Sequence, residues 1–250
     1  MRRIGSLLGL ALMMACGCGA ATGGENGGSE GASEEAIQGG AVDGKDPAVG
    51  LVWIRGGGFC TGTLIAPNVV LTAGHCVETK VASFYTGTGK GSADVGRLPA
   101  PGLVEHGVIQ QITHPSYRGG SACPNHTFDV ALLRLAAPIA GTAPLTLASA
   151  PPRAGVICRA VGYGVHDLAS GSVVEQRHSA TETVRAVETS AVRVTRKSGI
   201  SDHGDSGGPL LCGAHIAGTV SCGSAEYGET FYARVDGMRD WIAKTTAAWK

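Results

Sequence analysis

Residues 204–209, with the sequence GDSGGP, constrain this chain more than any other stretch. Glycines on both sides of Ser206 let the backbone fold tightly around the serine hydroxyl and turn amide hydrogens towards one point. Such an arrangement makes an oxyanion hole, whose donors we expect to be the N–H groups of Gly204 and Ser206. A surface turn would explain the small residues, but it would not explain Asp205, whose carboxylate needs a partner if it is buried. The stretch therefore predicts a nucleophilic serine.

Two upstream motifs supply the partners that a nucleophilic serine requires. Residues 71–76 (LTAGHC) contain His75, and residues 128–133 (FDVALL) contain Asp129. In the chain order His, Asp, Ser, the three motifs resemble the trypsin-like (chymotrypsin-fold) serine proteases, and the resemblance covers roughly residues 37–250. It implies a serine endopeptidase that hydrolyses peptide bonds through an acyl-enzyme, with His75 as the general base and Asp129 orienting its imidazole.

Two other functional classes share parts of this pattern. A binding protein could keep the protease fold and lose the chemistry, but such relatives usually lack the histidine or the serine, and this chain has all three triad positions. An esterase or lipase has a similar Gly-x-Ser-x-Gly turn on an α/β sheet, but its triad follows a different chain order. We therefore predict an active endopeptidase and keep the inactive protease-fold binding protein as the alternative.

Short aliphatic and β-branched runs separated by Gly, Pro and Asn predict an all-β protein. We expect strands at residues 49–54, 62–65, 69–71, 130–135, 154–161, 210–211, 216–220 and 230–235. The resemblance sharpens this class to two packed six-stranded antiparallel β-barrels, with their boundary within residues 138–152 and the active site in the cleft between them. A short C-terminal helix should follow, capped by Asp236 and running through Trp241 and Ile242.

The first 15 residues have the pattern of an export signal, in which two arginines precede an apolar run too short to span a bilayer. The run ends at Cys16 in a sequence that resembles the cleavage and lipidation site of bacterial lipoproteins. If Cys16 is lipidated, the resemblance implies that Gly17 as the next residue would favour delivery of the protein to an outer membrane. An ordinary signal peptide, with Cys16 and Cys18 incidental, remains the equal alternative. We expect a secreted or cell-envelope protein.

Residues 16–36 are rich in Gly, Ser and Glu and predict a flexible tether or propeptide, because they have too little apolar surface to bury. Ile37 then begins a sequence that resembles the family's activation site. Cutting between Ala36 and Ile37 would free an ammonium group that pairs with Asp205 and would convert a zymogen into the active form. Gln38 departs from the family's usual Val, and Ala36 is not the basic residue that a trypsin-like activator cuts after.

The composition indicates a globular enzyme without an electrostatic partner. The 250 residues contain 20 acidic and 20 basic residues and are 43% hydrophobic, so we expect protein or peptide substrates and no nucleic acid. The chain has no CxxC pair and no HExxH run, and we therefore expect no metal site and no cofactor. We expect a monomer.

Eight cysteines in an exported chain predict disulfides. The resemblance implies one bridge between Cys60 and Cys76, beside the catalytic histidine, and a second between Cys158 and Cys212. Two further cysteines border the cleft, Cys123 before the aspartate motif and Cys222 where the family commonly has Trp. We infer a bridge between Cys123 and Cys222, with two free thiols as the alternative.

The resemblance also outlines the primary specificity pocket. Its floor would be Ile200, and its walls would be Ser201, Ser221 to Gly223, and Thr230. A floor without a carboxylate cannot pair a Lys or Arg side chain, so we predict cleavage after small or medium apolar residues, an elastase-like preference. Asp202 stands where the family has the first cysteine of a pocket bridge, and without that bridge Asp202 or Glu226 could reach in and reverse the preference.

Overall fold

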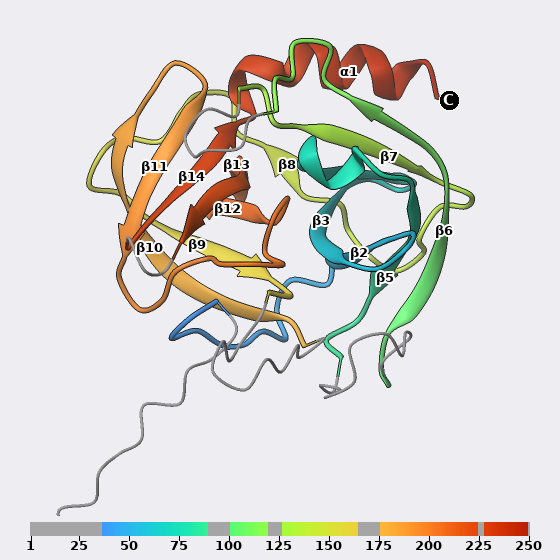
Figure 1. Cartoon of the computed structure of the whole chain (residues 1–250), viewed down its shortest axis with the longest axis horizontal. Helices are drawn as coiled ribbons and strands as arrows, with labels where there is room; N and C mark the ends of the chain where they lie inside the picture. Colours follow the sequence, from blue (N-terminus) through green and yellow to red (C-terminus); the bar gives the residue numbers. More distant parts are fainter. Residues whose placement is uncertain (1–36, 90–100, 120–126, 165–175, 225–227, 250) are drawn as a thin grey trace, which may run out of the picture. The chain divides into compact units, whose positions relative to one another are not determined.

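The computed structural model describes residues 37–89, 101–119, 127–164, 176–224 and 228–249. The predicted signal peptide, the tether and Cys16 lie outside these residues. Antiparallel strands dominate the described part, and the first group closes into a barrel in the order β2-β3-β4-β7-β6-β5 (Figure 1). Its strands are β2 (Val49–Ile54), β3 (Phe59–Ala66), β4 (Val69–Thr72), β5 (Val81–Thr86), β6 (Val104–Thr113) and β7 (Ala131–Leu135).

The second group of strands lies beside the first barrel and forms a barrel of its own (Figure 1). Its strands are β9 (Ile157–Gly162), β10 (His178–Val187), β11 (Ala191–Arg196), β12 (Pro209–Cys212), β13 (His215–Ser224) and β14 (Glu229–Arg234). The path β10-β11-β14-β13-β12-β9 is closed by pairing of β9 with β10. Two short strands extend it, β1 (Ala41–Val42) on β10 and β8 (Thr146–Leu147), which pairs with β13 in parallel. The predicted two-barrel fold is confirmed.

Side chains that alternate in direction along the strands explain why the barrels pack against each other. In β4, Val70 points into the core of the first barrel, whereas Val69 and Leu71 belong to an apolar cluster shared by both barrels. In β9, Ala160 lies in the core of the second barrel and Val161 lies in the shared cluster. Because successive residues of a strand point to opposite faces, strands that are apolar on both faces fill a barrel and an interface together.

The chain ends in helix α1 (Arg239–Ala247), which follows the 3-10 helix η2 (Asp236–Met238). The prediction that Asp236 caps this helix is wrong, since Met238 occupies the N-cap position without a side-chain bond. The Asp236 carboxylate instead accepts hydrogen bonds from Nε and Nη2 of Arg234, at 3.0 and 2.7 Å. Among the described residues, no helix has the length and apolar character needed to cross a membrane.

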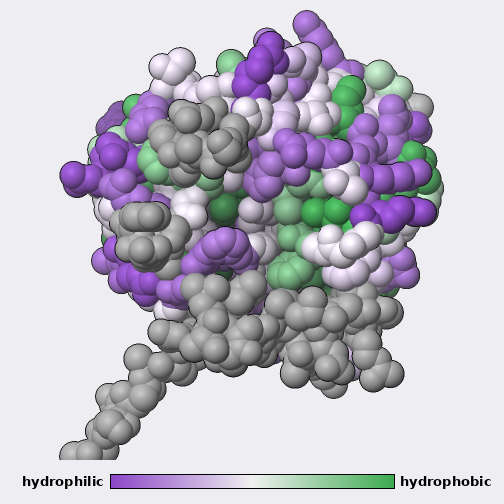
Figure 2. Space-filling model, viewed as in Figure 1, coloured by the Kyte–Doolittle hydropathy of each residue, from purple (hydrophilic) through white to green (hydrophobic). Residues whose placement is uncertain are grey.

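Strand β6 carries apolar side chains on the surface, including Val104 and Ile109, each about 60% exposed. The face of the molecule in Figure 2 shows apolar areas interrupted by hydrophilic residues. A surface of this kind is common for a globular protein, because there is too little polar surface to cover it completely.

Candidate active site

His75 begins the 3-10 helix η1 (His75–Val77), which follows strand β4 of the first barrel. Its backbone N–H donates to Oδ1 of Asp129 at 2.9 Å, and its ring Nδ1 lies 2.8 Å from Oδ2 of the same carboxylate. A carboxylate can only accept, so Nδ1 carries the proton and Nε2 remains a base. The next residue, Cys76, forms a disulfide with Cys60 of strand β3, which anchors this turn to the barrel.

Asp129 is fully buried just before strand β7, where Phe128 has a left-handed backbone with φ of 52°. Besides the two bonds to His75, its Oδ2 accepts a hydrogen bond from the hydroxyl of Ser221 at 2.6 Å. Ser221 belongs to β13, so the second barrel helps to hold the carboxylate of the first. Three donors to one buried carboxylate offset its desolvation and fix its orientation.

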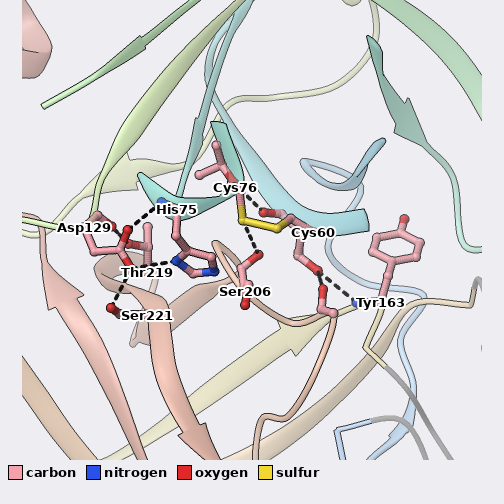
Figure 3. The surroundings of a disulfide bond; sticks show 11 residues. Cys60, His75, Cys76, Asp129, Tyr163, Ser206, Thr219 and Ser221 are labelled. Carbon is pink, nitrogen blue, oxygen red and sulfur yellow. Dashed lines mark hydrogen bonds and ion pairs between the residues drawn. A yellow bond between two sulfur atoms is a disulfide. The ribbon is translucent and has the colours of Figure 1, made fainter. Parts of the chain in front are cut away.

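Ser206 lies on the turn that precedes β12 of the second barrel. In Figure 3 the imidazole of His75 lies between the carboxylate of Asp129 and Ser206. The carbonyl oxygen of Ser206 accepts a hydrogen bond from the backbone N–H of Thr61 in the first barrel at 2.8 Å. The structure thus brings the three predicted triad residues together where the barrels meet.

The turn around Ser206 requires glycine at two positions. Gly204 has φ of 91° and Gly207 has φ of 80°, a left-handed conformation that other residues adopt at a cost. A Cβ at Gly204 would collide with the ring of Phe59, and one at Gly207 would collide with Thr72. Within the described part of the chain, the backbone N–H groups of Gly204 and Ser206 have no acceptor. They are available to a developing oxyanion.

A cavity of about 180 Å³ opens beside Ser206, and three residues of the predicted specificity pocket, Ser201, Gly223 and Thr230, line it. It is lined by Ser201, Asp202, His203, Ser206, Val220, Cys222, Gly223 and Thr230. Two predicted pocket residues are missing from this lining. Ile200 is fully buried and pairs through its backbone with Gln38, and the Ser221 hydroxyl is turned towards Asp129.

A buried carboxyl that sequence reasoning missed lies behind the cavity. Glu182 of β10 accepts hydrogen bonds from the backbone N–H of Ser201 at 2.8 Å and from the hydroxyl of Tyr232 at 2.6 Å. Burial raises the pKa of Glu182 to about 7, although these hydrogen bonds oppose the shift. Glu182 alternates with Ala180 and Val184 along β10, and all three side chains are buried. This alternation was the sequence signal that could have revealed a buried carboxyl.

Asp205 is fully buried beside the serine, as the sequence suggested, and it accepts hydrogen bonds from the backbone N–H groups of Gly164 and Asp202 at 2.8 and 2.9 Å. Burial raises its pKa to about 7, and the negative charges of Glu182 and Asp202 add to the effect. Ile37 is also fully buried, in the core of the second barrel.

The remaining cysteines follow the expected pattern in part. Cys158 and Cys212 form a disulfide between β9 and β12. Cys222 is disulfide-bonded, and Cys123, its inferred partner, lies outside the described residues.

Two closed antiparallel barrels, with histidine and aspartate from one and serine from the other, define a protein of the chymotrypsin fold. Comparison with known proteins agrees, since residues 38–242 match the Trypsin family. The chain belongs to the trypsin family of serine proteases.

Individual relatives are about 30% identical to this chain over the aligned residues. Snake venom serine proteinase 14 of Crotalus adamanteus is 32% identical over 218 residues, which cover 76% of this chain and 78% of the relative. Human kallikrein-4 is 28% identical over 217 residues, covering 76% and 78%.

Solved structures share the architecture. Neuropsin, a serine protease expressed in the limbic system of mouse brain, superimposes with a TM-score of 0.67 at 26% identity, covering 83% of this chain and 98% of that one. The structure of GrC gives a TM-score of 0.69 at 24% identity with the same coverage, which shows likeness of fold.

Proposed function

We propose that this protein is a serine endopeptidase in which Ser206 is the nucleophile, His75 the general base and Asp129 the residue that orients it. The observation that carries the proposal is the 2.8 Å contact between His75 Nδ1 and Asp129, with the imidazole lying between Asp129 and Ser206 (Figure 3). This arrangement leaves Nε2 as the base on the side of the serine.

The reaction follows from these positions. As the Ser206 hydroxyl attacks the substrate carbonyl, its proton passes to His75, and Asp129 stabilises the resulting cation. The N–H groups of Gly204 and Ser206 receive the negative charge that develops on the carbonyl oxygen. His75 then donates the proton to the leaving amine, which leaves an acyl-enzyme. A water molecule, deprotonated by His75, releases the acid and restores the serine.

We propose a preference for small or medium apolar residues before the cleaved bond. A cavity of about 180 Å³ suits such side chains, and the Thr230 hydroxyl, which donates to the carbonyl of Ser201 at 3.3 Å, occupies one side of it. The carboxyl of Glu182 lies behind Ser201 and Tyr232, whose hydroxyls both bond to it. These hydroxyls separate Glu182 from the cavity. The Asp202 carboxylate lines the cavity, but its oxygens already accept hydrogen bonds from Gln38 and His203, so neither carboxyl is a free partner for a Lys or Arg side chain.

We propose the following organisation for the chain. Residues 1–15 are a signal peptide, residues 16–36 a tether or propeptide, and residues 37–250 a monomeric protease domain whose barrels are divided within residues 138–152. The active form begins at Ile37, and the protein is secreted or held in a cell envelope through a lipid on Cys16. Support comes from the apolar run and the cysteine motif, and from the disulfides, which are typical of oxidising compartments.

Turnover of chromogenic peptides that differ in the residue before the scissile bond tests this function. We expect the form beginning at Ile37 to cleave after Ala, Val or Leu, and Ser206→Ala to abolish the activity. Ser116→Ala, at an exposed serine outside the site, serves as the matched control and should retain it. Cleavage after Arg or Lys alone would refute the preference and keep the triad. No turnover of any peptide, with the amino terminus verified as Ile37, would refute the proposed activity.

A further inference from the structure

Two positions at which this chain departs from the family pattern are in direct contact. Gln38 stands where the family usually has Val, and Asp202 stands where it has a pocket cysteine. The side-chain amide of Gln38 donates from Nε2 to Oδ2 of Asp202 at 3.0 Å, across 164 residues of sequence. A hydrogen bond to a carboxylate is about twice as strong as one between neutral groups. The predicted activation segment is therefore bonded to the wall of the specificity pocket.

Asp202 connects this bond to the catalytic turn. Its Oδ1 accepts the backbone N–H of His203 at 2.8 Å and lies 2.6 Å from the ring Nδ1 of the same residue. Its backbone N–H donates to Asp205 Oδ2, and its carbonyl accepts the N–H of Asp205 at 3.0 Å. The side chain of Asp202 is nearly fully buried and lines the same cavity as Ser206. Moving Asp202 would therefore disturb both the pocket wall and the turn that carries the oxyanion donors.

Gln38 is itself held from two further directions. Its carbonyl accepts the backbone N–H of Ile200 at 3.0 Å, in an isolated antiparallel bridge. Its side-chain oxygen accepts a hydrogen bond from Nη2 of Arg196 at 3.3 Å. The backbone bridge sets the position of Gln38, and from this position its NH₂ group faces Asp202. The bond to Asp202 thus depends on the docked position of the segment.

We propose that Gln38 and Asp202 are positioning residues that couple docking of the activation segment to order in the specificity pocket. The proposal rests on the endopeptidase activity proposed above. A disulfide would hold the pocket wall whether or not the segment is docked, whereas this hydrogen bond forms when the segment is in place. The chain thereby replaces a permanent link with a conditional one.

Substitution of Gln38 tests the coupling. Gln38→Leu has a similar size and removes the donor, leaving Asp202 Oδ2 without this partner. A hydrogen bond to a charged group changes an equilibrium constant by a factor of about 10 to 100. We therefore expect kcat/KM for peptides to fall by about 10-fold or more, mainly through a higher KM. Arg196→Met removes the partner on the other side of the same amide, and we expect it to stay within about twofold of wild type.

A swap of donor and acceptor separates positioning from general stability. Gln38→Glu alone sets two carboxylates against each other and should lower kcat/KM at least as much as Gln38→Leu. Gln38→Glu combined with Asp202→Asn lets the new amide donate to the new carboxylate while its oxygen still faces His203. We expect the double variant to exceed each single variant in kcat/KM. A double variant no better than the product of the two single effects would overturn the coupling.

Deuterium exchange of backbone amides gives a readout that needs no turnover. We expect the N–H groups of Asp202 and Asp205 to exchange faster in Gln38→Leu than in wild type or Arg196→Met, because both are hydrogen-bonded inside the turn. Unchanged exchange in Gln38→Leu would refute the coupling even if the enzyme is active. Faster exchange in a protein that cleaves no peptide would keep the coupling and refute the proposed activity.

Discussion

Cutting the chain before Ile37 should remove a pH dependence of stability that Asp205 creates. In the unbroken chain the nitrogen of Ile37 is an uncharged amide and offers no positive charge to the buried carboxyl. The pKa of Asp205 is raised from 3.8 to about 7. Burial is the main cause and the negative charges of Glu182 and Asp202 contribute, whereas hydrogen bonds from Asp202 and Gly164 oppose the shift.

The folded unbroken chain therefore keeps a proton on Asp205 between about pH 4 and pH 7 that the unfolded chain has released. Because the folded state binds more protons, the free energy of unfolding falls as the pH rises through this window and levels off above it. The difference between pKa values of 3.8 and about 7 corresponds to about 4 kcal/mol. For a domain of this size, that is a decrease of about 8–16 °C in melting temperature.

Two proteins test this reasoning, both with Ser206→Ala to prevent self-cleavage. One is the full chain, and the other begins at Ile37, whose ammonium would keep Asp205 ionised and lower its pKa. As the pH rises from 4.5 to 7.5, the melting temperature of the full chain should decrease relative to that of the shortened protein. Glu182 is present in both, so its contribution largely cancels in the difference. Parallel curves for the two proteins would refute the pairing of Ile37 with Asp205.

Three substitutions give further tests. Gly204→Ala should lower kcat by about 100-fold in peptide turnover, because the new Cβ meets Phe59 and displaces an oxyanion donor; unchanged kcat would exclude that donor. Ser221→Ala should lower kcat/KM by about 10-fold through loss of its 2.6 Å bond to the triad carboxylate. As a control, its free energy of unfolding in urea should stay within about 1 kcal/mol of wild type. Arg177→Met should cost about 3–5 kcal/mol in urea unfolding, since it removes the 2.8 Å ion pair of the buried Asp43; a smaller loss would mean that Arg159, 3.4 Å from the same carboxylate, compensates for it.

Strands with both faces buried were predictable from the sequence. Strand β2 spans Val49–Ile54, the range expected from its aliphatic run, and β4 extends the expected range by one residue to Thr72. Strands β5, β6, β10 and β11 were not among the expected ranges. In β6 and β10, polar residues interrupt the apolar pattern, and pairing with neighbouring strands maintains their extended form. The cap assigned to Asp236 failed for a related reason, since Arg234 competes successfully for its carboxylate.

The sequence by itself determined the family, because the residues around His75, Asp129 and Ser206 form local motifs whose spacing and glycines the chemistry demands. The tertiary structure alone decided which groups support them. Ser221 bonds to a carboxylate 92 residues away, and Gln38 reaches Asp202 across 164 residues. Such contacts leave no local pattern, because they depend on how two closed barrels place distant turns against each other.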